Sequence, residues 1–186
     1  MRNLRPSFVN LFCALWYRDF PIPVAGHGQH ERATWTTHIG ICVRSVADLL
    51  GYFTHFEQGK RTDAVITESD GKTVIAHVEW EWIQPFRESF NELQKLRDRR
   101  HTGELSVLIT YSRDDHHQMN MARIHEEWQS CTEPLIVFLV RFNFGKRQFT
   151  DLETYLVRNG KSKLIRTQPA YPWRVTGTRW EGPRDA

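Results

Sequence analysis

The chain has 186 residues, of which 40% are hydrophobic and 25% are charged, a composition typical of one globular domain with its own core. Three scattered cysteines without C-x-x-C spacing argue against a disulfide framework and a zinc ribbon, and favour the reducing cytoplasm. We find no apolar run of about 18 residues and no secretory leader, so we expect no membrane span.

The charge is distributed unevenly along the chain. Residues 1–140 carry 15 Lys/Arg against 18 Asp/Glu, whereas residues 141–186 carry 10 against 4. A basic C-terminal part beside an acidic remainder suits an anionic polymer such as DNA or RNA. Solvated surface charge is the other explanation, and the sequence leaves both open.

The first half of the chain predicts a loop, a helix and a hairpin. Residues 1–33 read as irregular after a short aromatic run, because PIPVAGHGQH has a loop composition. Apolar residues then recur at helical spacing from Thr34 or Thr36 to Leu50, and Gly51 follows as a stop. Segments 55–68 and 73–82, rich in β-branched and aromatic residues, predict two strands joined by SDGK.

The second half alternates between helices and strands. Residues 86–100 predict a helix after Pro85, 105–111 a buried strand, 119–130 a helix, and 134–142 the most hydrophobic strand. A short helix is expected around 151–160, followed by a tail of weak periodicity. This order predicts an α/β fold with a central mixed β-sheet between helical layers, a three-layer α/β/α arrangement. We assign 34–145 to the core, 1–33 to an N-terminal extension, and 146–186 to a basic C-terminal extension packed on the core.

The second hairpin strand carries an acidic face. Alternation places His77, Glu79 and Glu81 on one side and apolar residues including Val78 and Trp80 on the other. Side chains two apart on a strand lie roughly 7 Å from each other, so two carboxylates there repel unless a cation lies between them. Mg²⁺ prefers such oxygen ligands, although a solvent-facing amphipathic strand would show the same pattern.

Asp63 on the partner strand is the third acid, and its usefulness depends on the hairpin register. A two-residue turn at Asp70-Gly71 would place Asp63 opposite Val78, on the wrong face. A three-residue turn or one β-bulge would place Asp63 opposite Glu79. A shared metal site therefore requires the shifted register.

Asp63, fifteen intervening residues and Glu79-Trp80-Glu81, within a helix, hairpin, helix, strand order, resemble the PD-(D/E)XK superfamily of restriction-endonuclease-like nucleases. The resemblance covers roughly residues 34–142. It implies a restriction-endonuclease-like core, Mg²⁺ or Mn²⁺ held by Asp63 and Glu79, and phosphodiester hydrolysis. Thr62 replaces the motif's proline and Glu81 its lysine. Lys95 on the following helix is placed for the lysine's role, as some members of the superfamily have it.

The resemblance gives the residues the following roles. Asp63, Glu79, Glu81 and Lys95 would be catalytic, with Glu81 or Lys95 orienting or deprotonating the attacking water. Accessory candidates are Glu31, Gln94 and His77. Basic side chains can contact phosphates and aromatic side chains can stack on bases. The residues that we expect to make such contacts with nucleic acid are Lys60, Arg61, Arg97, Arg99, Arg100, Trp173, Arg174 and Arg179.

We therefore expect a metal-dependent nuclease that cuts DNA, most simply as an endonuclease, with RNA left open. Cutting both strands of a duplex needs two active sites, so a homodimer or a partner subunit is expected from function alone. The alternative is an inactive subunit of the same fold, which binds nucleic acid or assembles with a partner protein.

Overall fold

One mixed β-sheet organises the protein. The computed structural model describes residues 3–20, 32–58 and 62–177. In chain order and in space, the strands are β1 (Phe53–Gln58), β2 (Thr62–Thr67), β3 (Val74–Glu81), β4 (Leu105–Arg113), β5 (Leu135–Asn143), β6 (Gln148–Arg158) and β7 (Lys161–Pro169). The described α-helices are α1 (Leu4–Arg18), α2 (Arg32–Leu50), α3 (Glu92–Arg99) and α4 (His117–Glu127).

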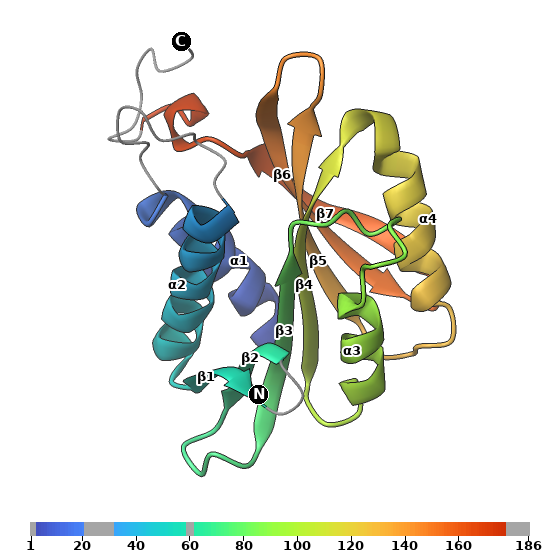
Figure 1. The fold of residues 1–186 in the computed structure, drawn as a ribbon. Helices are drawn as coiled ribbons and strands as arrows, with labels where there is room; N and C mark the ends of the chain where they lie inside the picture. Colours follow the sequence, from blue (N-terminus) through green and yellow to red (C-terminus); the bar gives the residue numbers. More distant parts are fainter. Residues whose placement is uncertain (1–2, 21–31, 59–61, 178–186) are drawn as a thin grey trace.

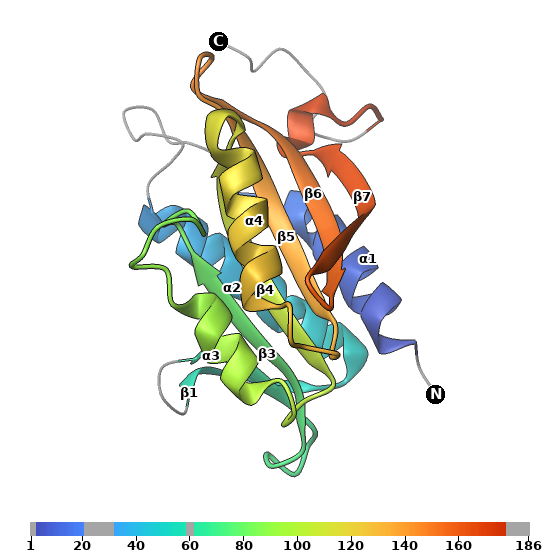
Figure 2. The same cartoon turned by 90° about the vertical axis from the view of Figure 1, so that its right-hand side faces the viewer.

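The strand directions divide the sheet into three parts. Strands β1, β2 and β3 form an antiparallel meander, β3, β4 and β5 are parallel, and β5, β6 and β7 are again antiparallel. The two parallel connections run through α3 and α4, which cover one face of the sheet, while α1 and α2 cover the other (Figures 1 and 2). The prediction of an α/β fold with helices on both faces of a mixed sheet is confirmed.

The central strands are apolar on both faces because both are covered. On β4, Val107 and Ile109 belong to the cluster beneath α1 and α2, whereas Leu108 belongs to the cluster beneath α3 and α4. On β5, Phe138 faces α1 and α2, and Val137 faces the other pair. Such double burial explains why these two strands read as continuous hydrophobic runs.

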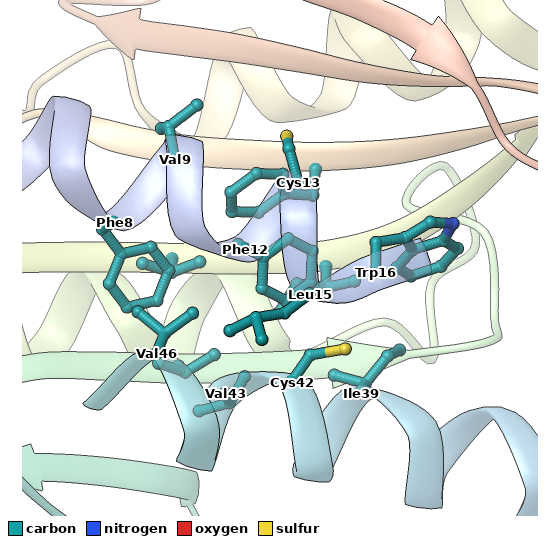
Figure 3. Packing of buried hydrophobic residues seen from close by; sticks show 14 of the residues in the cluster. Phe8, Val9, Phe12, Cys13, Leu15, Trp16, Ile39, Cys42, Val43 and Val46 are labelled. Carbon is teal, nitrogen blue, oxygen red and sulfur yellow. The ribbon is translucent and has the colours of Figure 1, made fainter. Parts of the chain in front are cut away.

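The N-terminal segment differs from the expectation of an irregular extension. Residues Leu4–Arg18 form α1, and Phe8, Phe12 and Trp16, spaced by four, are at most 1% exposed. Phe12 lies against Phe138 of β5 with ring centroids 4.1 Å apart. Figure 3 shows α1 and α2 side by side, with their apolar side chains meeting over the sheet. The short aromatic run is therefore one buried helix face.

Two predictions near the hairpins were wrong. The strand expected over 55–68 is two paired strands, β1 and β2, and Glu57 near the end of β1 has a left-handed φ of 53°. The helix expected around 151–160 is instead part of β6. Asn159 and Gly160, with φ of 51° and 67°, form the turn into β7, and Asn-Gly is a strong hairpin signal.

The remaining elements agree with the sequence prediction. Helices α2 and α4 and strands β4 and β5 lie where expected, whereas α3 begins only at Glu92, after a series of turns. Segments 1–33 and 146–186, which we had assigned to extensions, supply α1, β6 and β7 to the same layered unit.

If α1 is part of the core, Phe12→Ala lowers the free energy of unfolding by about 3–5 kcal/mol, because it leaves a cavity between α1 and the sheet. Urea unfolding followed by circular dichroism measures this change. Leu49→Ala, at a side chain 58% exposed on α2, is the control and should change stability by no more than about 0.5 kcal/mol. A Phe12→Ala effect as small as the control would contradict the packing described.

Candidate active site

The register of the β2–β3 hairpin brings two carboxylates together. Ala64 pairs with Val78 and Thr67 with Val74, so the register shifts by one residue at a bulge between Ile66 and Thr67. Asp63, the next residue before Ala64, consequently lies across from Glu79. The register that a shared site requires is therefore the observed one.

The turn between β2 and β3, next to this bulge, is held by Asp70. Its carboxylate accepts hydrogen bonds from the backbone N–H groups of Lys72 and Thr73, each at 2.8 Å, and from the Thr73 hydroxyl at 2.7 Å. Gly71 has a φ of 66°, which favours glycine. The local sequence fixes the turn, and the bulge then sets the face on which Asp63 lies.

Asp63 and Glu79 are held differently. Asp63 is half-buried, and its Oδ2 accepts a hydrogen bond of 2.7 Å from the backbone N–H of Trp80. Glu79 is fully buried, and its Oε2 lies 3.2 Å from Lys95 Nζ. The other Glu79 oxygen, Oε1, is buried and has no hydrogen-bond partner among the described residues, which is unusual for a buried carboxyl oxygen.

Lys95 reaches the carboxylates from α3. Leu93 and Leu96 are buried under this helix and fix its rotation, so Lys95, between them, turns toward β3. Its Nζ lies between Glu79 and Glu92, whose Oε1 is 3.4 Å away. Gln94, one residue earlier, is exposed and about 100° around the helix, so it does not share this position.

Burial and crowding set the protonation of the group. Burial, together with the neighbouring Asp63 carboxylate, raises the pKa of Glu79 to about 8, although Lys95 lowers it. Burial also raises the pKa of Asp63, which the Trp80 N–H and Lys95 lower. Burial lowers the pKa of Lys95, but Glu79, Glu92 and Asp63 together outweigh it and raise that pKa. At neutral pH the metal-free site therefore holds an ammonium group and a proton shared by two carboxyls.

An open cavity of about 390 Å³ gives access to this cluster. Asp63, Glu92 and Lys95 line it, together with Glu57, Arg32 and Trp82. A larger cavity of about 690 Å³ adjoins it through Lys95 and is lined by His77 and Arg99 as well. Both cavities open beside α3, so the cluster is reached from outside even though Glu79 itself is buried.

Glu81 does not join the cluster in the way expected. Its Oε1 accepts hydrogen bonds from the backbone N–H groups of Trp82 and Ile83 at 2.6 and 3.2 Å, and from Arg32 at 3.0 Å. The side chain lines the cavity, but its carboxylate is already occupied by backbone N–H groups at the end of β3 and by Arg32 of α2. The Glu81 carboxylate is therefore already occupied by donors, and of the two candidates Lys95 is the better placed to orient a water beside Glu79.

The residues that we expected to contact nucleic acid lie in different parts of the structure. Arg97 and Arg100 are paired with Glu127 and Glu133, and Arg99 lines the larger cavity. Trp173, which we expected to stack on bases, is 8% exposed and stacks on Tyr171 instead, because the tail packs on the core.

The remaining members of that set are placed as follows. Arg174 donates a hydrogen bond of 3.1 Å to Gln148 beside the same aromatic pair. Lys60, Arg61 and Arg179 lie outside the described residues, as does the accessory candidate Glu31.

His77, an accessory candidate, is 5% exposed and pairs with Val65, two residues along β2 from Asp63. Thr102 donates its hydroxyl to the Arg99 carbonyl, so His77 Nε2–H donates to Thr102 Oγ1 at 2.8 Å. Burial, together with the positive charge of Arg99, lowers the pKa of His77 to about 4. His77 is therefore neutral at pH 7 and supports the wall of the larger cavity.

The oxygen donors of this site suit a hard cation that needs only one or two protein ligands. Within residues 3–20, 32–58 and 62–177, no three His, Cys, Asp or Glu side chains are grouped to hold a metal ion. Mg²⁺, however, commonly uses only one or two protein carboxylates and keeps several waters. Asp63 and Glu79 meet that smaller requirement, and the unpartnered Oε1 of Glu79 is an oxygen that a cation would satisfy.

Sequence reasoning missed three residues at this site: Glu92, Glu57 and Arg32. The spacing of Glu92 and Lys95, three residues apart in one helix, could have indicated the first. Nothing in the sequence indicated Glu57 or Arg32, because their positions depend on how β1 and α2 pack.

Comparison with known proteins adds no family. A scan against protein-family models found no match, and neither did a search of curated proteins. In the described part of the chain, no helix has the length and apolar character needed to cross a membrane.

The pKa of Glu79 predicts a pH-dependent effect of Glu79→Gln on the metal-free protein. An unfolded glutamate ionises near pH 4, but Glu79 keeps its proton to about pH 8, so the wild type loses stability between these values. Glu79→Gln cannot ionise, and its stability relative to wild type should rise from pH 5 to pH 8 and then level off. Thermal unfolding in EDTA across pH 5–9 measures the difference.

The exposed Glu88→Gln provides the control, since its stability difference from wild type should not change across the same range. A Glu79→Gln protein that is equally destabilised at every pH would show that Glu79 is ionised throughout and that the burial argument is wrong.

Proposed function

We propose that the protein is a metal-dependent nuclease of the PD-(D/E)XK type, which hydrolyses phosphodiester bonds in DNA. The observation that carries the proposal is the meeting of Asp63, Glu79 and Lys95, supplied by β2, β3 and α3, beside an open cavity. Two carboxylates and an ammonium group in one partly buried cluster are expensive to maintain without a function.

The arrangement of elements supports the same proposal. Helix α2, the meander β1–β3, helix α3 and the parallel strand β4 follow the helix, hairpin, helix, strand order of the resemblance. Asp63 lies near the start of β2, and Glu79 lies across from it on β3. The motif places its two acids in the same way, on neighbouring strands. A restriction-endonuclease-like core is the fold that we propose on this basis.

The side chains have distinct roles in this mechanism. Asp63 and Glu79 would hold Mg²⁺ or Mn²⁺, with Glu79 giving up its proton on binding. The cation would lower the pKa of a bound water and polarise the scissile phosphate. Lys95 remains protonated because its pKa is raised, so it donates hydrogen bonds rather than accepting a proton. It would orient the attacking water and offset the negative charge that develops on the phosphorus oxygens.

The first test is metal-dependent nicking of supercoiled plasmid DNA. Wild-type protein should nick the plasmid in Mg²⁺ or Mn²⁺ but not in EDTA, and Asp63→Asn and Glu79→Gln should abolish nicking because both remove a ligand charge. Gel-shift assays in EDTA should show DNA binding retained. Binding without cleavage in either metal would instead support the alternative, an inactive subunit of this fold.

The second test separates Lys95 from Glu81. Lys95→Ala should lower the single-turnover cleavage rate by roughly 10²–10³, the usual loss for one charge-stabilising donor. Glu81→Gln should lower it by less than about tenfold, since the carboxylate is occupied by backbone N–H groups and Arg32. Lys72→Ala, in the exposed hairpin turn, is the matched lysine control. A reversed ranking of Lys95 and Glu81 would assign the role to the strand residue.

A further inference from the structure

A third cavity, of about 360 Å³, lies where the parallel strands β3, β4 and β5 end. Its walls include Trp82 after β3, Tyr111 and Arg113 near the end of β4, and Phe142 near the end of β5. In Figure 1 these strand ends point toward the β5–β6 turn. The carboxyl ends of parallel strands are a common place for ligands in α/β folds.

The lining combines aromatic rings with positive charge. Trp82 lies 5.8 Å from Tyr111 and 5.6 Å from Trp35 between ring centroids. The cavity is also lined by Arg32, Arg113 and Arg147, and none of the described residues that line it is acidic. Rings for stacking beside guanidinium groups for phosphates are the combination with which proteins bind unpaired nucleotides.

Phe144 forms an exposed platform at the rim. It is 50% exposed in the β5–β6 turn, and the guanidinium carbon of Arg113 lies 3.6 Å from its ring centroid. A large aromatic ring in this position buries little of itself in the protein core. Its stabilised orientation leaves a surface on which a flat, polar ring can stack.

One cation in the cavity lacks an acidic partner. Arg147 has no acidic partner among the described residues, whereas Arg32 and Arg113 are paired with Glu81 and Asp115. An arginine of this kind fits a ligand that carries a negative charge, such as a phosphate.

The cavity lies next to the candidate active site. Arg32 and Trp82 line both cavities, and Arg32 is the residue that holds Glu81. A chain of nucleotides could therefore place one residue in the aromatic cavity while a neighbouring phosphate lies near Asp63 and Lys95.

We propose that this cavity binds an unpaired nucleotide and that the substrate is single-stranded or locally unpaired nucleic acid. The inference rests on the proposed nuclease function for its neighbour site, but its own evidence is the aromatic and arginine lining. The base stacks on Phe144 or the Trp82 side of the cavity, and its phosphate meets Arg147.

The experiment measures fluorescence anisotropy with the full chain in EDTA, so that no strand is cut. The probes are a labelled oligo(dT) of about 15 nucleotides, an abasic strand of equal length, and a duplex of equal length. Oligo(dT) should bind at least tenfold more tightly than the abasic strand or the duplex. Phe144→Ala should reduce the affinity for oligo(dT) by about tenfold and leave the abasic strand unchanged, as expected for loss of one stacking contact.

Arg147→Ala should instead weaken oligo(dT) and the abasic strand equally and lower the salt dependence by about one counterion, because it contacts phosphate. The matched controls are Phe53→Ala, at a ring 53% exposed on β1, and Arg158→Ala, an exposed arginine at the opposite end of β6. Both controls should bind like wild type.

Equal binding of the three probes, or an equal effect of Phe144→Ala and Phe53→Ala, would overturn the inference. Plasmid nicking with no base-dependent binding would overturn it while leaving the nuclease proposal intact. Base-dependent binding lost in Phe144→Ala, with no cleavage in any metal, would support the inference and refute the nuclease.

Discussion

The one-residue bulge between Ile66 and Thr67 decides what the protein can do at its acidic cluster. Without it, Asp63 would lie across from Val78 and join the apolar face under α1 and α2, where an unpaired carboxylate has no partner. With it, Asp63 shares a face with Glu79 and receives the Trp80 N–H. A change of one position in register thus converts an amphipathic hairpin into a place where two carboxylates and a lysine converge.

The cluster is electrostatically unbalanced in a way that suits ligand binding. Glu79 is fully buried, its Oε1 has no hydrogen-bond partner among the described residues, and even with Lys95 beside it the carboxyl keeps its proton at neutral pH. A group with a purely structural role would be completed by further donors, because an unsatisfied buried polar atom destabilises the fold. Under the proposed function, a cation that enters from the adjoining cavity would replace the proton and complete this set.

Local sequence rules predicted the mixed sheet and its helical layers, because these depend on periodicity and element order. They also placed Asp63 and Glu79 on neighbouring strands, and left the register between those strands open. Helix α1 was missed, although Phe8, Phe12 and Trp16 repeat at four residues, since an aromatic run without caps resembles a loop flank. Strand β6 was taken for a helix because it is buried on both faces and carries a bulge, which hides the alternation. Arg32 could not be predicted at the site, since its place depends on how α2 packs against the end of β3.

Glu81 stands on β3 where the resemblance would place a lysine, and the surrounding charges show how the site accommodates this acid. A third acid at the strand end would add repulsion to Asp63 and Glu79, but Arg32 and two backbone N–H groups neutralise it locally. The positive charge is supplied from α3 instead, and Leu93 and Leu96 fix Lys95 through core packing. Glu81 then holds Arg32 at the boundary between the acidic cavity and the aromatic one. Under the proposed function, Glu81 would therefore lie between the site of cleavage and the nucleotide bound beside it.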